Sequence, residues 1–109
     1  MSLPAEPADD ADIERPSREG ALVRILPILN MRGLHARASA KFVQTVEKFE
    51  AEVTVTRGHE TVGGTSIMGL MMLSASVGTS IKVEATGAQA AQVLEALETL
   101  VAGRFGEDE

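Results

Sequence analysis

The sequence of 109 residues has no cysteine, no tryptophan and no tyrosine, and only three phenylalanines. Without cysteine the chain has no disulfide, no catalytic thiol and no thiolate metal ligand. Its two histidines lie far apart, so a metal site would need an improbable set of carboxylates, and we expect neither a metal nor another cofactor. A chain of this length predicts one domain with a modest core of aliphatic and methionine side chains.

Long hydrophobic runs are absent as well. No stretch approaches the roughly 18 apolar residues that cross a bilayer, so we expect a cytoplasmic protein without membrane insertion. The net charge of −6 is concentrated at the two ends of the chain. Residues 1–19 contain six acids against two arginines, and residues 107–109 are all acidic. The segment between them is nearly neutral, with eight basic and seven acidic residues.

This distribution predicts three parts of the chain. Residues 1–19 combine Pro, Ala, Asp and Glu without periodic apolar positions, a composition that favours a disordered acidic extension. Such an extension either aids solubility or reflects a misplaced start of the reading frame. The folded domain is expected at residues 20–103, followed by an acidic C-terminal tail at residues 104–109.

Within the domain, strand and helix patterns alternate in the order β-α-β-β-α-β-α. Strands such as Thr79–Thr86 have one apolar and one polar face and need covering on one side only. The pattern therefore predicts an α+β fold, an open-faced sandwich in which a four-stranded antiparallel sheet carries three helices on one face. The expected strands are Ala21–Ile28, Glu52–Arg57, Glu60–Gly63 and Thr79–Thr86, and the expected helices are Ala36–Phe49, Thr65–Leu73 and Ala88–Ala102.

The loop that leads into the first long helix places His35 at the N-cap and Arg37 in the first turn. First-turn N–H groups have no intrahelical partner and carry partial positive charge, so they favour an anion, and Arg37 adds a cationic donor fork. Histidine is an uncommon N-cap, and a neutral imidazole is able to attack phosphorus. These residues alone leave two interpretations open, a phosphoryl-accepting histidine or a surface histidine that ends a loop.

Two motifs together carry a resemblance to a known family. Gly33-Leu34-His35-Ala36-Arg37 and Thr65-Ser66-Ile67-Met68-Gly69-Leu70-Met71 resemble HPr, the histidine phosphocarrier of the bacterial phosphoenolpyruvate phosphotransferase system. The match covers about residues 20 to 103. The resemblance implies the HPr-like open-faced sandwich and a phosphoryl carrier, not a turnover enzyme.

The resemblance also implies roles for individual residues. His35 would accept a phosphoryl group on Nδ1 from enzyme I and pass it to enzyme IIA-type acceptors. Arg37, with the helix start at Ala36 and Arg37, would stabilise the phosphoryl oxygens. Family members typically have proline where this chain has Ala38, so the exact geometry of the phosphate pocket is expected to differ, while the helix should still form because alanine favours helices. We expect a monomer.

The second motif places Ser66 before the short helix, where serine is a preferred N-cap. In relatives the equivalent serine is phosphorylated by a dedicated kinase, which implies regulation through Ser66 by a serine kinase/phosphorylase. The helix itself is apolar nearly all round, which favours either core packing or an adaptable docking surface. We expect Ile67, Met68 and Met71 to contact enzyme I and the acceptors.

Two further functions compete with that of a phosphoryl carrier that serves sugar uptake. The first is a regulatory adapter in the nitrogen-related branch of the phosphotransferase system, which would use the same chemistry at His35. The second is a nucleic-acid-binding α+β module, but the strands have no aromatic side chains for base stacking, so we expect no nucleic-acid partner. His59 lies in a turn without a motif around it and is expected to be a plain surface histidine.

Overall fold

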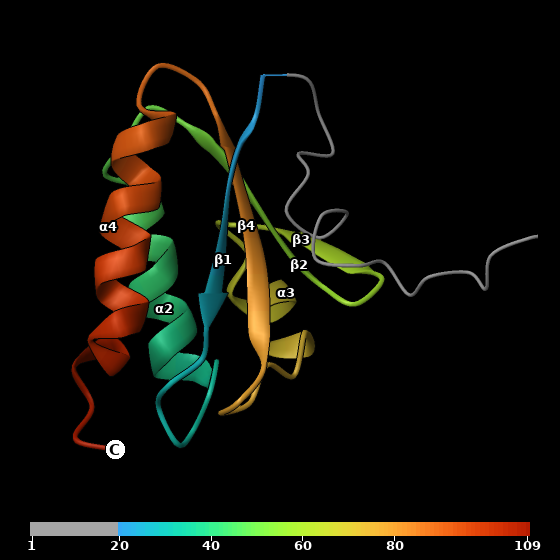
Figure 1. Ribbon diagram of the computed structural model, residues 1–109, viewed down its shortest axis with the longest axis vertical. Helices are drawn as coiled ribbons and strands as arrows, with labels where there is room; N and C mark the ends of the chain where they lie inside the picture. Colours follow the sequence, from blue (N-terminus) through green and yellow to red (C-terminus); the bar gives the residue numbers. More distant parts are fainter. Residues whose placement is uncertain (1–19) are drawn as a thin grey trace, which may run out of the picture.

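The structure, a computed structural model, describes residues 20–109. The predicted acidic extension, residues 1–19, lies outside the described residues. From residue 20 onward the elements follow in the predicted order β-α-β-β-α-β-α, with one short 3-10 helix after them (Figure 1). They are β1 (Leu22–Pro27), α2 (Ala36–Val46), β2 (Glu52–Arg57), β3 (Glu60–Gly63), α3 (Ile67–Met72), β4 (Ser80–Thr86), α4 (Ala90–Ala102) and η1 (Arg104–Gly106).

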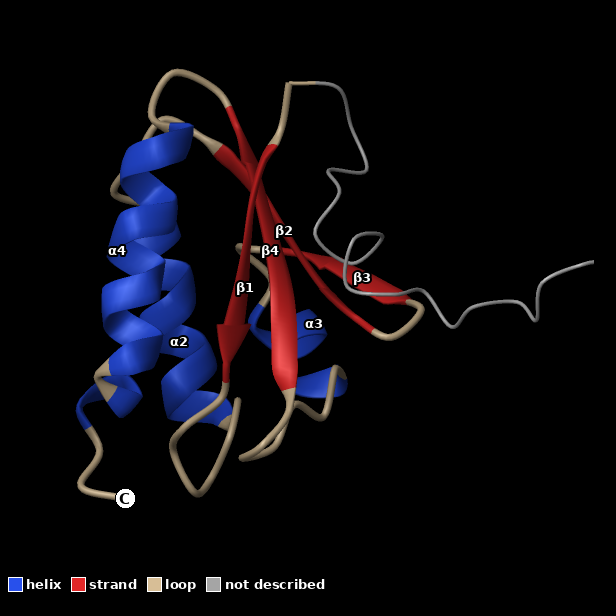
Figure 2. Cartoon of the chain, viewed as in Figure 1, coloured by secondary structure: helices blue, strands red, loops and turns tan. Residues whose placement is uncertain are grey.

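The strands form one antiparallel sheet in the order β1-β4-β2-β3. Val55 of β2 lies opposite Val83 of β4, and both side chains are buried on the same face. Figure 2 shows α2 and α4 running along one side of the sheet. Phe42 of α2, Leu70 of α3 and Leu97 of α4 join these valines in one hydrophobic core, so all three helices cover this face. The predicted open-faced α+β sandwich is confirmed.

The helices are short, and α2 ends earlier than predicted, at Val46 instead of Phe49. The N–H of Lys48 donates to the carbonyl of Thr45, and the N–H of Phe49 to that of Val46. Bonds between residues three positions apart tighten the chain into turns, which closes the helix while Phe49 still packs partly against the core. Within residues 20–109, no helix combines the length and apolar character needed to cross a membrane.

The loop between β1 and α2 is fixed to the loop between α3 and β4. The N–H of Ile28 donates to the carbonyl of Thr79 at 2.8 Å, and the N–H of Leu34 donates to that of Ala75 at 3.0 Å. Gly33 has φ +64°, and a Cβ at this position would lie well under 3.0 Å from the Ala75 carbonyl oxygen. Only glycine meets both conditions without strain. These contacts set the point at which α2 begins.

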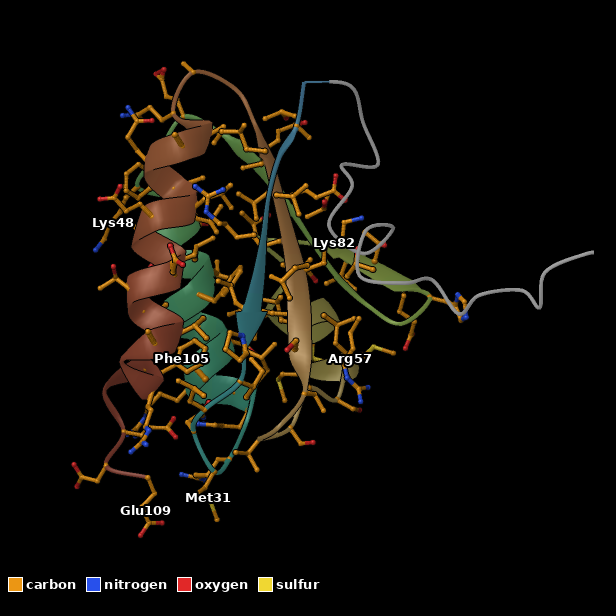
Figure 3. The ribbon with its side chains drawn as sticks, in the orientation of Figure 1. Met31, Lys48, Arg57, Lys82, Phe105 and Glu109 are labelled. Carbon is orange, nitrogen blue, oxygen red and sulfur yellow. The ribbon has the colours of Figure 1, made fainter. Side chains whose placement is uncertain are left out.

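Beyond α4 the chain folds back toward the start of α2 (Figure 3). Phe105 is fully buried in the core, and Lys41 Nζ of α2 donates to its backbone carbonyl. Further on, the N–H of Met31 donates to the carbonyl of Glu109 at 3.1 Å. Residues 104–109, expected as an acidic tail, therefore pack against the same end of the domain as the loop that carries His35.

Candidate functional site

His35 occupies the N-cap position of α2, as the sequence predicts. Its backbone is extended, with φ −74° and ψ −177°, and its carbonyl accepts the N–H of Ser39 at 2.8 Å. The side chain forms no capping hydrogen bond with the helix and is 19% exposed. The imidazole ring thus stands at the start of the helix, partly open to solvent, without serving as the cap itself.

Ala36 and Arg37 follow in the first turn of α2 and are both exposed. Among residues 20–109 the Arg37 guanidinium has no hydrogen-bond or ion-pair partner, so its donor fork is available to an anion. Ala38, which stands where the family typically has proline, is fully buried in the core. The helix forms without that proline, as expected, and the small methyl group packs under the site.

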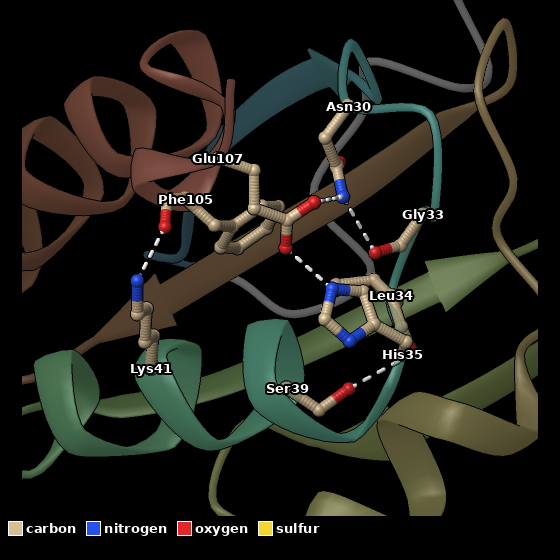
Figure 4. A network of polar contacts seen from close by, with 8 residues as sticks. All are labelled: Asn30, Gly33, Leu34, His35, Ser39, Lys41, Phe105 and Glu107. Atoms are coloured by element: carbon tan, nitrogen blue, oxygen red, sulfur yellow. Dashed lines mark hydrogen bonds and ion pairs between the residues drawn. The ribbon is translucent and has the colours of Figure 1, made fainter. Parts of the chain in front are cut away.

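A polar network holds the ring of His35 at its Nε2 edge (Figure 4). Nε2 of His35 contacts Oε2 of Glu107, and Oε1 of the same carboxylate accepts a hydrogen bond from Asn30 Nδ2 at 3.1 Å. The Asn30 amide also donates to the carbonyl of Gly33 at 2.9 Å. Asn30 is fully buried, and the Glu107 side chain is 17% exposed. The network therefore connects the loop that carries His35 to the C-terminal segment.

The pKa of Glu107 lies below its ordinary value of 4.5. Partial burial of the carboxyl acts in the opposite direction and raises this pKa, but hydrogen bonds from His35 and Asn30 outweigh burial, and the nearby positive charge of Arg32 adds to their effect. Glu107 is consequently ionised at neutral pH, and its carboxylate is able only to accept hydrogen bonds.

Ser66 caps α3, as predicted. Its Oγ accepts the backbone N–H of Gly69 at 2.9 Å, and the residue is exposed. The structure does not place Ser66 in the network around His35. It lies apart from that network, at the start of another helix.

The apolar residues of α3 divide into an inner and an outer set. Leu70 is fully buried in the core, whereas Met68 and Met72 are each 67% exposed. Ile67 and Met71 are 40% and 37% exposed, which agrees with the expectation that Ile67, Met68 and Met71 face outward. Met72 belongs to the same outer set although the sequence analysis did not select it.

Sequence reasoning missed two residues of the site, Asn30 and Glu107. Asn30 is an ordinary loop residue by composition, and its complete burial follows only from the tertiary structure. Glu107 is one of three consecutive acids, and no local pattern separates it from its neighbours. The one available signal was Phe105, a large apolar side chain that an exposed tail would not be expected to contain.

A comparison with protein families decides the assignment. A family model described as "PTS HPr component phosphorylation site" matches residues 23–103. The chain belongs to the HPr family. The matched range includes His35 and Ser66, and it runs from β1 to the end of α4.

This chain aligns with individual HPr proteins over nearly their whole length. Phosphocarrier protein HPr of Neisseria meningitidis is 51% identical over 88 residues, which cover 81% of this chain and 99% of the relative. The HPr of Cupriavidus necator is 43% identical over the same shares of the two chains. The crystal structure of HPr-C-His from Thermoanaerobacter tengcongensis superposes with a TM-score of 0.76 at 38% identity, covering 80% of this chain and 98% of the other. The chain is thus an HPr phosphocarrier of the phosphotransferase system, a carrier of phosphoryl groups and not an enzyme.

Proposed function

We propose that this HPr-family chain accepts a phosphoryl group from enzyme I on Nδ1 of His35 and passes it to enzyme IIA-type acceptors. The observation that carries the proposal is the contact between Glu107 and Nε2 of His35. It leaves Nδ1 as the ring nitrogen without a hydrogen-bond partner among residues 20–109. An imidazole at a helix start with one free nitrogen has the arrangement that a phosphorus nucleophile needs.

The transfer is a displacement at phosphorus in each direction. The lone pair of Nδ1 attacks phosphorus, the bond from phosphorus to the donor atom of enzyme I breaks, and its electron pair stays on the donor. In the second transfer an acceptor atom attacks, the bond to Nδ1 breaks, and the electron pair returns to the imidazole. No proton or cofactor is consumed in either step, which suits a relay protein.

The start of α2 supplies the stabilisation that the transferred group requires. The N–H groups of the first turn have no partner within the helix and lie at the positive end of its dipole. Exposed Arg37, two positions after His35, adds a permanent positive charge with a planar donor fork. Together they lower the energy of the negative oxygens while phosphorus is bonded partly to both partners.

The outer apolar residues of α3 provide the proposed docking surface, which we assign to Ile67, Met68 and Met71. Methionine side chains are flexible and adapt to different partners, as a carrier with one donor and several acceptors requires. We propose that the protein works as a monomer, which keeps this surface open to its partners. Light scattering at working concentration would measure that state directly.

The central test is phosphorylation with phosphoenolpyruvate and enzyme I. We expect an acid-labile adduct on the wild-type protein, and its loss in His35→Ala. His59→Ala is the matched control, because His59 is the other histidine and lies exposed in the turn between β2 and β3. An adduct that persists in His35→Ala, or that disappears in His59→Ala alone, would contradict the proposal. Nitrogen NMR of the ring would identify the modified atom.

The sugar-uptake and nitrogen-related branches use the same chemistry at His35, so the partners must decide between them. We propose transfer from enzyme I of the sugar branch. The ratio of the initial phosphorylation rates with purified enzyme I and with its nitrogen-branch counterpart measures this preference. Faster transfer from the nitrogen-branch donor would assign the chain to the regulatory alternative.

Ser66 is proposed as a regulatory phosphorylation site for a serine kinase/phosphorylase. It is exposed and begins the helix that carries the docking surface, so a phosphate there adds negative charge next to Ile67. The variant Ser66→Asp keeps a good N-cap and adds such a charge. We expect it to fold normally and to accept phosphate from enzyme I more slowly than Ser66→Ala, whereas equal rates would argue against regulation at this position.

A further inference from the structure

We infer that Glu107, oriented by the buried amide of Asn30, is a positioning residue that fixes the tautomer of His35 for phosphoryl transfer. The inference rests on the proposed role of His35 as the phosphoryl acceptor. It assigns a function to the C-terminal segment, which lies beyond the range that the family model matches.

The tautomer follows from the hydrogen-bonding capacity of the two groups. An ionised carboxylate has no proton to donate, so the contact between Glu107 and Nε2 requires the proton on Nε2. In the neutral ring the lone pair then lies on Nδ1. Glu107 thus selects the form of His35 in which Nδ1 is the nucleophile, and it leaves Nδ1 directed away from the carboxylate, as Figure 4 shows.

The orientation of Asn30 is fixed by its two acceptors. Its Nδ2 donates both to Glu107 and to the carbonyl of Gly33. The opposite amide orientation would place an oxygen against two oxygens. The observed one leaves Asn30 Oδ1 buried without a partner among residues 20–109, a cost that a purely structural amide would not be expected to bear. The side chain is therefore committed to holding the Glu107 carboxylate in place.

The backbone on both sides of Glu107 is anchored as well. Phe105 is fully buried and its carbonyl accepts from Lys41, while the carbonyl of Glu109 accepts from Met31. These contacts come from α2 and from the loop before it, so they hold the backbone around Glu107 at the same end of the domain as the ring. The hydrogen bonds from His35 and Asn30 and the nearby charge of Arg32 all favour the ionised form of Glu107.

The same contact assists both directions of transfer. As the bond from Nδ1 to phosphorus forms, the ring acquires positive charge, and the carboxylate beside Nε2 stabilises that charge. When the phosphoryl group leaves, the electron pair returns to Nδ1 and the Nε2 proton stays on the ring throughout. Glu107 therefore neither gains a proton nor touches phosphorus, and it acts on the reaction only through His35.

The first measurement is the tautomer of His35, which needs no partner protein. In nitrogen-edited NMR of the full chain at neutral pH we expect wild type to show a protonated Nε2 and an unprotonated Nδ1. Glu107→Gln should increase the population with the proton on Nδ1, because a glutamine amide is able to donate to Nε2. Glu109→Gln is the matched control, since within residues 20–109 Glu109 is tied only through its backbone carbonyl. An unchanged ring spectrum in Glu107→Gln would overturn the inference.

The second measurement is the rate of phosphorylation by phosphorylated enzyme I. We expect Glu107→Gln to slow it by about tenfold to a hundredfold, the range found for carboxylates that orient metal-bound histidines, with Glu109→Gln close to wild type. The variant Asn30→Asp places a carboxylate against Glu107 and should give the same change in the ring spectrum, provided that its backbone spectrum remains native.

The two proposals fail in different ways. A wild-type rate for Glu107→Gln together with an inactive His35→Ala would remove Glu107 and leave the phosphoryl acceptor intact. An adduct that survives in His35→Ala would remove the acceptor itself, while the tautomer measurement would still report on the contact.

Discussion

The side chains of His35 and Glu107 meet at Nε2 although 72 positions separate them in the chain. The contact joins the first helix of the domain to the segment after the last one. Because Glu107 is bonded in its ionised form, the contact depends on pH. Its effect on folding is therefore measurable apart from phosphoryl transfer.

Stability should respond to acid through Glu107. Its pKa is below 4.5 in the folded protein and ordinary in the unfolded chain, so its contribution is complete above about pH 4.5 and is lost as pH falls through the lowered value. We expect the free energy of unfolding of wild type to exceed that of Glu107→Gln by about 1 to 2 kcal/mol at neutral pH. This difference should vanish in acid. Urea denaturation over the acid range measures it. A difference that stays constant with pH would contradict this account.

Gly33→Ala should be strongly destabilising. The new methyl group would collide with the Ala75 carbonyl oxygen, and the residue would be strained at φ +64°. We expect a loss of roughly 3 kcal/mol or more in the free energy of unfolding. Gly58→Ala is the matched control, because Gly58 has the same φ and nothing within 4 Å of the added Cβ, so only about 1 kcal/mol should be lost. Equal losses would show that the Ala75 contact is unimportant.

Phe105→Ala tests whether residues 104–109 are part of the folded unit. Removing a fully buried phenylalanine should cost about 3 to 5 kcal/mol, as in any well-packed core. Phe49→Ala, which removes a partly buried ring in the turns after α2, should cost less. Thermal or urea unfolding provides both values. A negligible effect of Phe105→Ala would return this segment to the status of a tail.

Met68→Lys should weaken transfer without affecting the fold. The side chain is 67% exposed, so we expect a change in stability within about 0.5 kcal/mol. A charge in the centre of the docking surface should lower the rate of phosphorylation by enzyme I several-fold. Leu22→Lys is the control, since Leu22 is 40% exposed on β1 and outside α3. Similar rates for the two variants would place the docking surface elsewhere.

The predictable part of the fold was the part that local patterns encode. The apolar spacing through Phe42 and Val46 indicated the face of α2 that the core now buries, and alternation around Val55 and Val83 indicated the inner face of the sheet. His35 was detectable because it breaks the usual preference at an N-cap. Helix ends were less predictable, since the turns after Val46 depend on individual hydrogen bonds.

The rest of the candidate site depends on contacts between distant segments, which a single sequence does not encode locally. Glu107 and Asn30 acquire their roles only because the chain returns to the start of α2 after α4. The burial of Phe105 drives that return, but in the sequence this ring is flanked by polar residues and glycines and followed by three acidic residues, a composition typical of exposed chain ends. Charge at a chain end therefore proved a poor guide to whether the end is folded.

The hydrogen bond between the Glu109 carbonyl and the N–H of Met31 has a practical consequence for handling the protein. Anything fused behind Glu109, whether an affinity tag, a fluorophore or a further domain, would begin next to the loop that carries the imidazole of His35. It would compete for the approach that incoming donors and acceptors need.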